Sequence, residues 1–157
     1  MTRQEIIRQL KRYFDIRELV CSHTYQKFGE NVSWQFLDTE ALHTLLVLRT
    51  QILKCGMVIN DYIFAGNNEQ RGLRCNICPI PKDKTDKNLI YLSAHCNGAG
   101  FDVVFGKHTG MTAEKARSLI LENQHLLPYN IRLEARVTWL HIDCYDTGEK
   151  VSYFYST

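Results

Sequence analysis

The chain has 157 residues, 45% of them hydrophobic and 23% charged, a composition that suits one globular domain with a hydrophobic core. Its 19 basic and 17 acidic residues give a net charge of +2, which argues against the basic surface that nucleic-acid binding requires. No apolar run approaches the roughly 20 residues that a membrane span needs. We therefore expect a single monomeric domain over residues 1–157 that neither spans a membrane nor binds nucleic acid.

The N-terminal residues 1–12 are charged and amphipathic, and they lack the apolar core of a secretion signal. We therefore expect cytoplasmic synthesis without a signal peptide, so that a target outside the membrane would be reached only after transport or release. The six cysteines would permit three disulfide bridges, but nothing indicates an oxidising compartment, and we expect mostly reduced thiols. Cys75 and Cys78 form one C-x-x-C pair, for which we recognise no second ligand pair. We interpret them as loop cysteines, and the sequence leaves open whether they bind metal.

Apolar spacing and capping residues predict the elements in chain order. A short amphipathic helix is expected over 2–13 and an irregular surface loop over 14–33. Asp38 or Thr39 is the expected N-cap of the main core helix, which should run to about residue 54 and end at Gly56. The later elements are expected to be a buried strand over 57–60, a loop over 61–86, strands over 89–92 and 101–105, a helix capped by Thr112, and strands over 130–134, 138–144 and 151–155. Helices first and strands later favour an α+β fold, with helices packed on one face of a small antiparallel sheet.

Two histidines and an aspartate lie where a sheet can bring them together. His95 ends a predicted strand, and Asp102 lies inside the next one, after a glycine-rich turn. His141 lies in the middle of a later strand. Two imidazoles and a carboxylate are a common catalytic zinc set that leaves a fourth position for water. Taken alone, however, a histidine and an aspartate at this spacing are common by chance, and a single strand histidine is more often packed in a core.

A water activated by zinc needs a nearby carboxylate to take its proton. Glu134 precedes His141 in the chain, and Asp143 lies two residues after that histidine, on the same face of its strand. These two carboxylates are therefore the candidate general bases.

The stretch from Ser93 to Asp102 resembles the first signature of the zinc D-alanyl-D-alanine carboxypeptidase family, S-x-H-x-x-G-x-A-x-D, with Gly100 in place of the alanine. The second signature, W-x-H-x-D, resembles the stretch from Trp139 to Asp143. This family shares its fold with the hedgehog signalling domain. The resemblance covers roughly residues 14–155, and it implies a hedgehog/D,D-peptidase-like fold.

The same resemblance implies that His95, Asp102 and His141 bind Zn²⁺. Arg74 matches the arginine that faces substrate in this family, although Leu73 departs from the usual tyrosine beside it. Arg74 is therefore a candidate clamp for a peptide carboxylate. Ser93 is a second candidate for substrate binding, the alternative being that it only closes the end of its strand.

The pattern leaves two candidates for the general base, because several family members place a catalytic glutamate three positions before the last zinc histidine. In this chain that position is Thr138. Glu134 lies in an R-L-E turn that resembles phage-type members, and it is the preferred base. Asp143 is the second choice, and its alternative role is to orient a ligand histidine from outside the ligand set.

The resemblance implies a zinc metallopeptidase, a hydrolase that cleaves peptidoglycan stem peptides either as a D,D-carboxypeptidase or as an endolysin-type endopeptidase. Such an enzyme would serve cell wall degradation by a phage or prophage. The alternative is a catalytically inactive zinc-binding domain of the same fold, acting in cell-wall binding or as a phage structural component. Thr138 favours that alternative. The bond cleaved, host or phage origin and the oligomeric state stay open.

Overall fold

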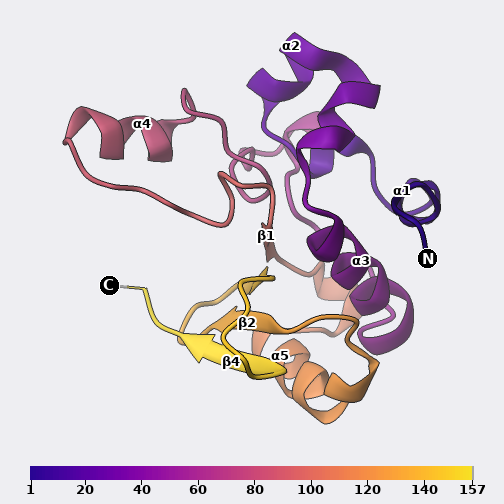
Figure 1. The fold of residues 1–157 in the computed structure, drawn as a ribbon. Helices are drawn as coiled ribbons and strands as arrows, with labels where there is room; N and C mark the ends of the chain where they lie inside the picture. Colours follow the sequence, from indigo (N-terminus) through magenta and orange to yellow (C-terminus); the bar gives the residue numbers. More distant parts are fainter. Residues whose placement is uncertain (157) are drawn as a thin grey trace.

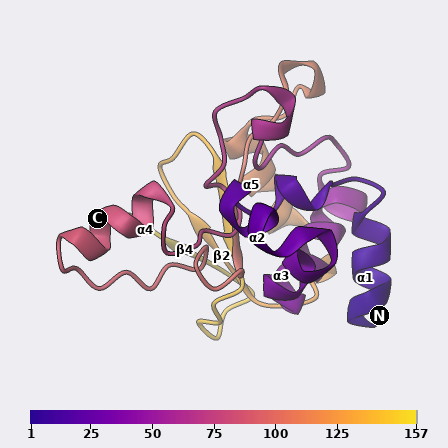
Figure 2. The same ribbon diagram turned by 90° about the horizontal axis from the view of Figure 1, so that it is seen from above.

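The computed structural model describes residues 1–156, and this part of the chain folds as an α+β domain (Figure 1). Its five α-helices are α1 (Arg3–Leu10), α2 (Ser22–Ser33), α3 (Thr39–Val47), α4 (Pro79–Asp86) and α5 (Ala113–Glu122). Its four strands are β1 (Gly100–Val103), β2 (Ile131–Glu134), β3 (Leu140–Asp143) and β4 (Val151–Phe154). In both ribbon views α4 stands at one side of the domain, away from α1 and α3 (Figures 1 and 2).

The four strands form one sheet in the order β1-β3-β2-β4. β3 is antiparallel to β1 and to β2, whereas β4 is parallel to β2. The prediction of an antiparallel sheet is therefore wrong at one edge, and the sheet is mixed. The reason lies in the connection after β3. Because β3 is antiparallel to β2, it ends beside the start of β2. β4 begins near that same end and follows the free edge of β2, so it runs parallel to β2.

Alternation along the strands gives the sheet one apolar and one polar face. Leu133 and Ile142 are buried in a core cluster that also contains Leu45 of α3 and Ile120 of α5. The intervening residues, such as His141 and Asp143, point to the opposite face. The predicted packing of helices on one face is thus found for α3 and α5, and the polar face is left for the site.

The core helix begins where the sequence predicts, because the Asp38 carboxylate accepts the backbone N–H of Ala41 at 2.9 Å. After Val47 the helix widens into a π-helical turn over Leu48–Ile52. Lys54, with a left-handed backbone (φ 54°), follows this turn, so the helix ends before the predicted Gly56.

Other predicted elements need correction. The segment 14–33 is not an irregular loop, because it contains α2, a helix kinked at Gly29 (φ 72°). The predicted loop 61–86 contains α4, which begins with proline in its first turn, where the missing N–H costs nothing. The predicted strand 57–60 forms only an isolated bridge, and the segment 89–92, exposed except for the half-buried Tyr91, forms no strand. The predicted first helix, the Thr112-capped helix and the four remaining strands are confirmed within a few residues.

None of the helices in the described part of the chain combines the length and the apolar character that crossing a membrane requires.

Candidate metal centre

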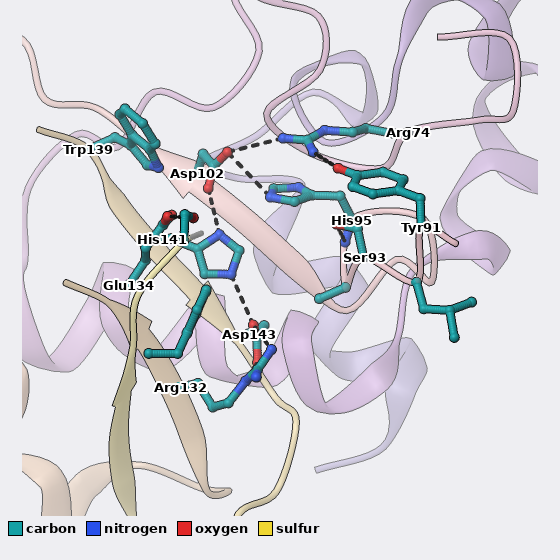
Figure 3. A pocket seen from close by; sticks show the side chains of 14 residues that line it. Arg74, Tyr91, Ser93, His95, Asp102, Arg132, Glu134, Trp139, His141 and Asp143 are labelled. Atoms are coloured by element: carbon teal, nitrogen blue, oxygen red, sulfur yellow. Dashed lines mark hydrogen bonds and ion pairs between the residues drawn. The ribbon is translucent and has the colours of Figure 1, made fainter. Parts of the chain in front are cut away.

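The structure brings the three predicted zinc ligands together (Figure 3). Nε2 of His95 lies 3.3 Å from one oxygen of Asp102, and Nδ1 of His141 lies 2.7 Å from the other. The ligand atoms of all three residues lie within 4.8 Å of one another, and all three residues are buried. The set therefore has the spacing that one shared cation requires.

The backbone explains how this set arises. Asp102 on β1 and His141 on β3 are direct partners in the antiparallel register, so their side chains leave the sheet side by side. His95 comes from the tight turn that precedes β1. Gly98 closes this turn with φ 67°, and a Cβ atom there would lie 2.1 Å from the carbonyl oxygen of Phe36. Only glycine fits this position without a backbone shift.

Each histidine ring has an acceptor at both of its nitrogens. Nδ1 of His95 lies 2.9 Å from the carbonyl oxygen of Gly72, while Nε2 faces Asp102. Burial lowers the pKa of His95, against the opposing effect of Asp102, so its ring is neutral and carries one N–H. With that hydrogen donated to Gly72, an Nε2 lone pair faces a carboxylate oxygen. These two atoms are both acceptors and repel each other, and a cation bound between them would remove the repulsion.

His141 lies between two carboxylates. Nδ1 faces Asp102, and Nε2 lies 3.0 Å from an oxygen of Asp143. Burial alone would lower the pKa of His141, but hydrogen bonds to Asp102 and Asp143 outweigh burial and raise the pKa to about 9. Burial would also raise the pKa of Asp102, but its hydrogen bonds with the two histidines hold that pKa well below its usual range. Asp102 therefore stays ionised, as a carboxylate ligand of a cation must be.

Asp143 has partners for both of its oxygens. Arg132 donates to them from Nε and Nη2, each at 2.9 Å, and the backbone N–H of Tyr145 donates to one of them at 3.1 Å. The guanidinium of Arg132 also lies over the ring of Phe154, 4.5 Å from its centroid. Asp143 is thus a fixed, charge-compensated acceptor behind His141.

The centre lines a pocket of about 370 Å³ on the polar face of the sheet. Glu134 lines the same pocket from the end of β2; its side chain is almost fully buried and accepts a hydrogen bond from the hydroxyl of Ser156. Ser93 also lines the pocket, and its hydroxyl accepts the backbone N–H of His95 at 3.2 Å. The structure therefore places both residues near the predicted ligands, and their catalytic or binding roles stay predictions.

Arg74 reaches the centre from the opposite side. Its Nη2 lies 3.3 Å from Asp102, its Nη1 donates to the hydroxyl of Tyr91 at 2.6 Å, and its Nε donates to the carbonyl of Gln70 at 2.6 Å. The guanidinium is thus held rigidly at the rim of the pocket, next to the Asp102 carboxylate.

Three residues that line or support the centre were not singled out as site residues from the sequence. Arg132 lies two residues before Glu134, so strand alternation was a signal that it shares that face. Trp139 lines the pocket, and its indole N–H is buried without a partner among the described residues, which makes it a free donor for a ligand. No pattern in the sequence indicated a role for Arg117 of α5, because only the tertiary fold brings this residue to the sheet.

Arg117 fixes the turn between β2 and β3. It is almost fully buried and donates to the backbone carbonyls of Glu134, Val137 and Trp139, at 3.2, 2.7 and 2.8 Å respectively. The positions of Glu134 and Trp139 in the pocket therefore depend on one arginine outside it.

Comparison with known proteins gave no match to a protein-family model, a curated protein or a solved structure. The similarity to the zinc carboxypeptidase family thus rests on the residues named above, and the function is a proposal from the geometry of the site.

Proposed function

We propose that this domain is a zinc-dependent peptidase that hydrolyses the stem peptides of peptidoglycan. The observation that carries the proposal is the convergence of His95, Asp102 and His141 in one pocket that also contains a buried carboxylate, Glu134. Catalytic zinc sites use such a three-residue set and keep one position open for water or substrate.

The donor set suits zinc better than calcium or magnesium, which prefer oxygen ligands alone. His95, Asp102 and His141 would hold the ion, and Gly72 and Asp143 would orient the two imidazole rings from behind. When bound, zinc would polarise the scissile carbonyl and make an attacking water more acidic.

The chain's own residues would supply proton transfer. Glu134 would accept the proton of the attacking water and pass it to the leaving amine, because it is the carboxylate in the pocket that no arginine or histidine engages. Asp143 is less suited to this role, because both of its oxygens are already held by Arg132, His141 and Tyr145. We therefore assign Asp143 the task of orienting His141.

Substrate would be held by groups at the rim of the pocket. The Arg74 guanidinium offers positive charge to a peptide carboxylate, and the unpartnered N–H of Trp139 offers a donor to a carbonyl or carboxylate. Ser93 adds a hydroxyl on the same rim. Stem peptides, which end in carboxylates, suit this arrangement. In this proposal the domain acts on the wall after release from the cell, as an endolysin does.

The second candidate is a catalytically inactive zinc-binding domain that binds the cell wall or serves in a phage particle. The observation that favours it is Thr138, which stands where several members of the similar family carry their catalytic glutamate. Such a domain would bind zinc and peptidoglycan without turnover.

The deciding experiment measures the amino groups released from purified peptidoglycan by the full chain. We expect release that a chelator abolishes, that added zinc restores and that His141→Ala lacks. Glu134→Gln should keep its zinc but lose activity by about 100-fold or more, whereas the matched variant of an exposed glutamate, Glu149→Gln, should behave as wild type. The mass of the product then identifies the bond cleaved.

A folded, zinc-loaded protein that releases no amino groups from several peptidoglycan types would overturn the peptidase proposal. Sedimentation with insoluble peptidoglycan would then test the inactive binding domain. Activity that persists in Glu134→Gln and disappears in Asp143→Asn would move the role of general base to Asp143.

A further inference from the structure

A second cluster of metal-ligating side chains lies away from the pocket. It joins Cys21 and His23, at the start of α2, to Cys75 and Cys78, just before α4. These two segments are far apart in the sequence and lie side by side in the fold, where Val20 and Leu73 form a parallel bridge (Figure 1). The expectation that the C-x-x-C pair has no second ligand pair is therefore wrong: the second pair is C-x-H, at Cys21 and His23.

The distances within the cluster match a tetrahedral zinc site. The Sγ atoms of Cys75 and Cys78 are 3.6 Å apart, and Nδ1 of His23 lies 3.6 Å from the first and 3.7 Å from the second. Ordinary zinc–ligand bond lengths place two sulfurs of a tetrahedron about 3.8 Å apart, and a sulfur and a nitrogen about 3.6 Å apart. The ligand atoms of all four residues lie within 4.8 Å of one another.

A disulfide does not explain the cluster. All six cysteines are free, and the Sγ separation of 3.6 Å in Cys75–Cys78 is far longer than the roughly 2.0 Å of a disulfide bond. Three thiols and one imidazole collected at one point instead form a complete zinc ligand set, with no position left for a substrate.

We propose that Cys21, His23, Cys75 and Cys78 bind a structural zinc ion. This site is separate from the candidate catalytic centre, and the proposal does not depend on the peptidase activity. Cys21 and Cys78 are buried, whereas His23 and Cys75 are partly exposed. The ion would therefore lie at the edge of the domain, accessible for loading but shielded on its inner side.

The backbone prepares the site. The N–H of Cys21 donates to the carbonyl of Leu73 at 3.0 Å, and the N–H of Leu73 donates to the carbonyl of Leu19 at 2.9 Å. Within the C-x-x-C pair, the N–H of Cys78 donates to the carbonyl of Cys75 at 3.1 Å. This hydrogen bond closes a tight turn, so that both sulfurs lie on the same side of it. The hydroxyl of Thr24 lies 3.1 Å from Sγ of Cys21 and can orient that thiolate.

The position of the site gives it a structural task. The segment that carries Cys75 also carries Gly72, whose carbonyl holds the ring of His95, and Arg74, which pairs with Asp102. A zinc ion at the cluster would tie this segment to the start of α2 and so hold both contacts in place. Loss of this ion should therefore loosen the pocket without removing any of its ligands.

The test is cobalt substitution of the full chain under reducing conditions. Cobalt bound to thiolates gives an intense sulfur-to-metal charge-transfer absorption in the near ultraviolet, which a site of two imidazoles and a carboxylate cannot give. We expect this absorption in wild type and in His141→Ala, and its loss in the double variant Cys75→Ser, Cys78→Ser. The matched control is Cys55→Ser, Cys144→Ser, which should keep it, because these two cysteines lie outside the cluster.

Metal content gives an independent readout. Wild type should bind two zinc ions per chain, and the double variant at Cys75 and Cys78 should bind one fewer. If that variant does not fold, wild type still decides the question: zinc should protect Cys21, Cys75 and Cys78 from alkylation, but not the other cysteines, as mapped by mass spectrometry. A reduced, folded wild type with no charge-transfer absorption and no protection by zinc would overturn the proposal. A Cys75–Cys78 disulfide in the native protein, seen as a mass two hydrogens lower, would do the same.

Discussion

The carboxylate of Asp143 lies 3.0 Å from Nε2 of His141, on the side of the ring opposite to Asp102. Because Arg132 holds that carboxylate through both oxygens, the position of the His141 ring is fixed from behind. We predict that Asp143→Asn weakens zinc binding at the catalytic centre by about tenfold to a hundredfold, the usual effect of removing an outer partner of a ligand histidine. Competition with a chromogenic chelator measures the change.

The control for this prediction is Asp86→Asn, which alters an exposed aspartate on α4 and should leave zinc affinity unchanged. At saturating zinc, Asp143→Asn should regain most of its activity, whereas Glu134→Gln should not. An Asp143→Asn protein with wild-type zinc affinity would contradict the orienting role.

Zinc affinity at the catalytic centre should fall as the pH decreases. The two carboxylates beside His141, acting against burial, raise the pKa of that ring to about 9, so the ring of the apo protein is mostly protonated below this pH. Zinc needs the neutral ring, and each binding event must therefore release a proton. The expected loss of affinity is about tenfold for each pH unit below about 9.

Titration calorimetry in buffers of different ionisation enthalpy measures this released proton directly. The same titration of His141→Ala, which lacks one ligand of this centre, gives the protons that the thiols of the cysteine cluster release, and these are subtracted. A zinc affinity that stays constant over this pH range would contradict the raised pKa of His141.

Gly98→Ala should destabilise the fold strongly, whereas Gly110→Ala should not. Both glycines have a left-handed backbone, with φ 67° and φ 65° respectively, so both substitutions carry the same conformational strain of about 1–2 kcal/mol. At Gly98 the added Cβ also meets the carbonyl oxygen of Phe36 at 2.1 Å, while at Gly110 it meets nothing within 4 Å. Urea denaturation of the two variants should differ by at least about 2 kcal/mol in the free energy of unfolding. Equal free energies of unfolding for the two variants would show that the backbone around residue 98 can shift to accommodate the added Cβ atom.

Arg117→Met should lower the free energy of unfolding by about 2–4 kcal/mol, because it leaves three backbone carbonyls, one buried and two partly buried, without their donor. It should also lower activity at saturating zinc, because the turn that positions Glu134 loses its anchor. Thermal denaturation and the peptidoglycan assay measure the two effects, with the exposed Arg12→Met as the control. A stable Arg117→Met protein with full activity would show that the turn holds its shape unaided.

The resemblance to the zinc carboxypeptidase family predicts the ligand set, whereas the strands that carry it are predicted from patterns that act locally. Asp102 and His141 lie in segments whose apolar residues alternate, so the strands and their polar face were predictable from short-range pattern alone. His95 and Gly98 belong to a motif of ten residues. The cap at Asp38 is a local feature as well, since its side chain bonds to a backbone N–H three residues away.

The parts that sequence reasoning missed depend on contacts between distant segments. His23 and Cys75 are 52 positions apart, and only the bridge between Val20 and Leu73 brings them together. The parallel neighbour of β2 follows from the path of one loop, which composition does not determine. α2 was missed because Gly29 interrupts it and because the residues buried along it are polar, Thr24 and Ser33.

The alternation that divides the two faces of the sheet also sets how this domain can change in evolution. Along β2, Arg132 and Glu134 face the pocket, while Leu133 between them lies in the core. Substitutions on the pocket side can therefore change the lining of the pocket without disturbing packing, and those on the helix side can adjust stability without changing that lining. Insertions and deletions have no such freedom: one residue added within β1 would turn Asp102 into the core and put a phenylalanine or valine among the metal ligands.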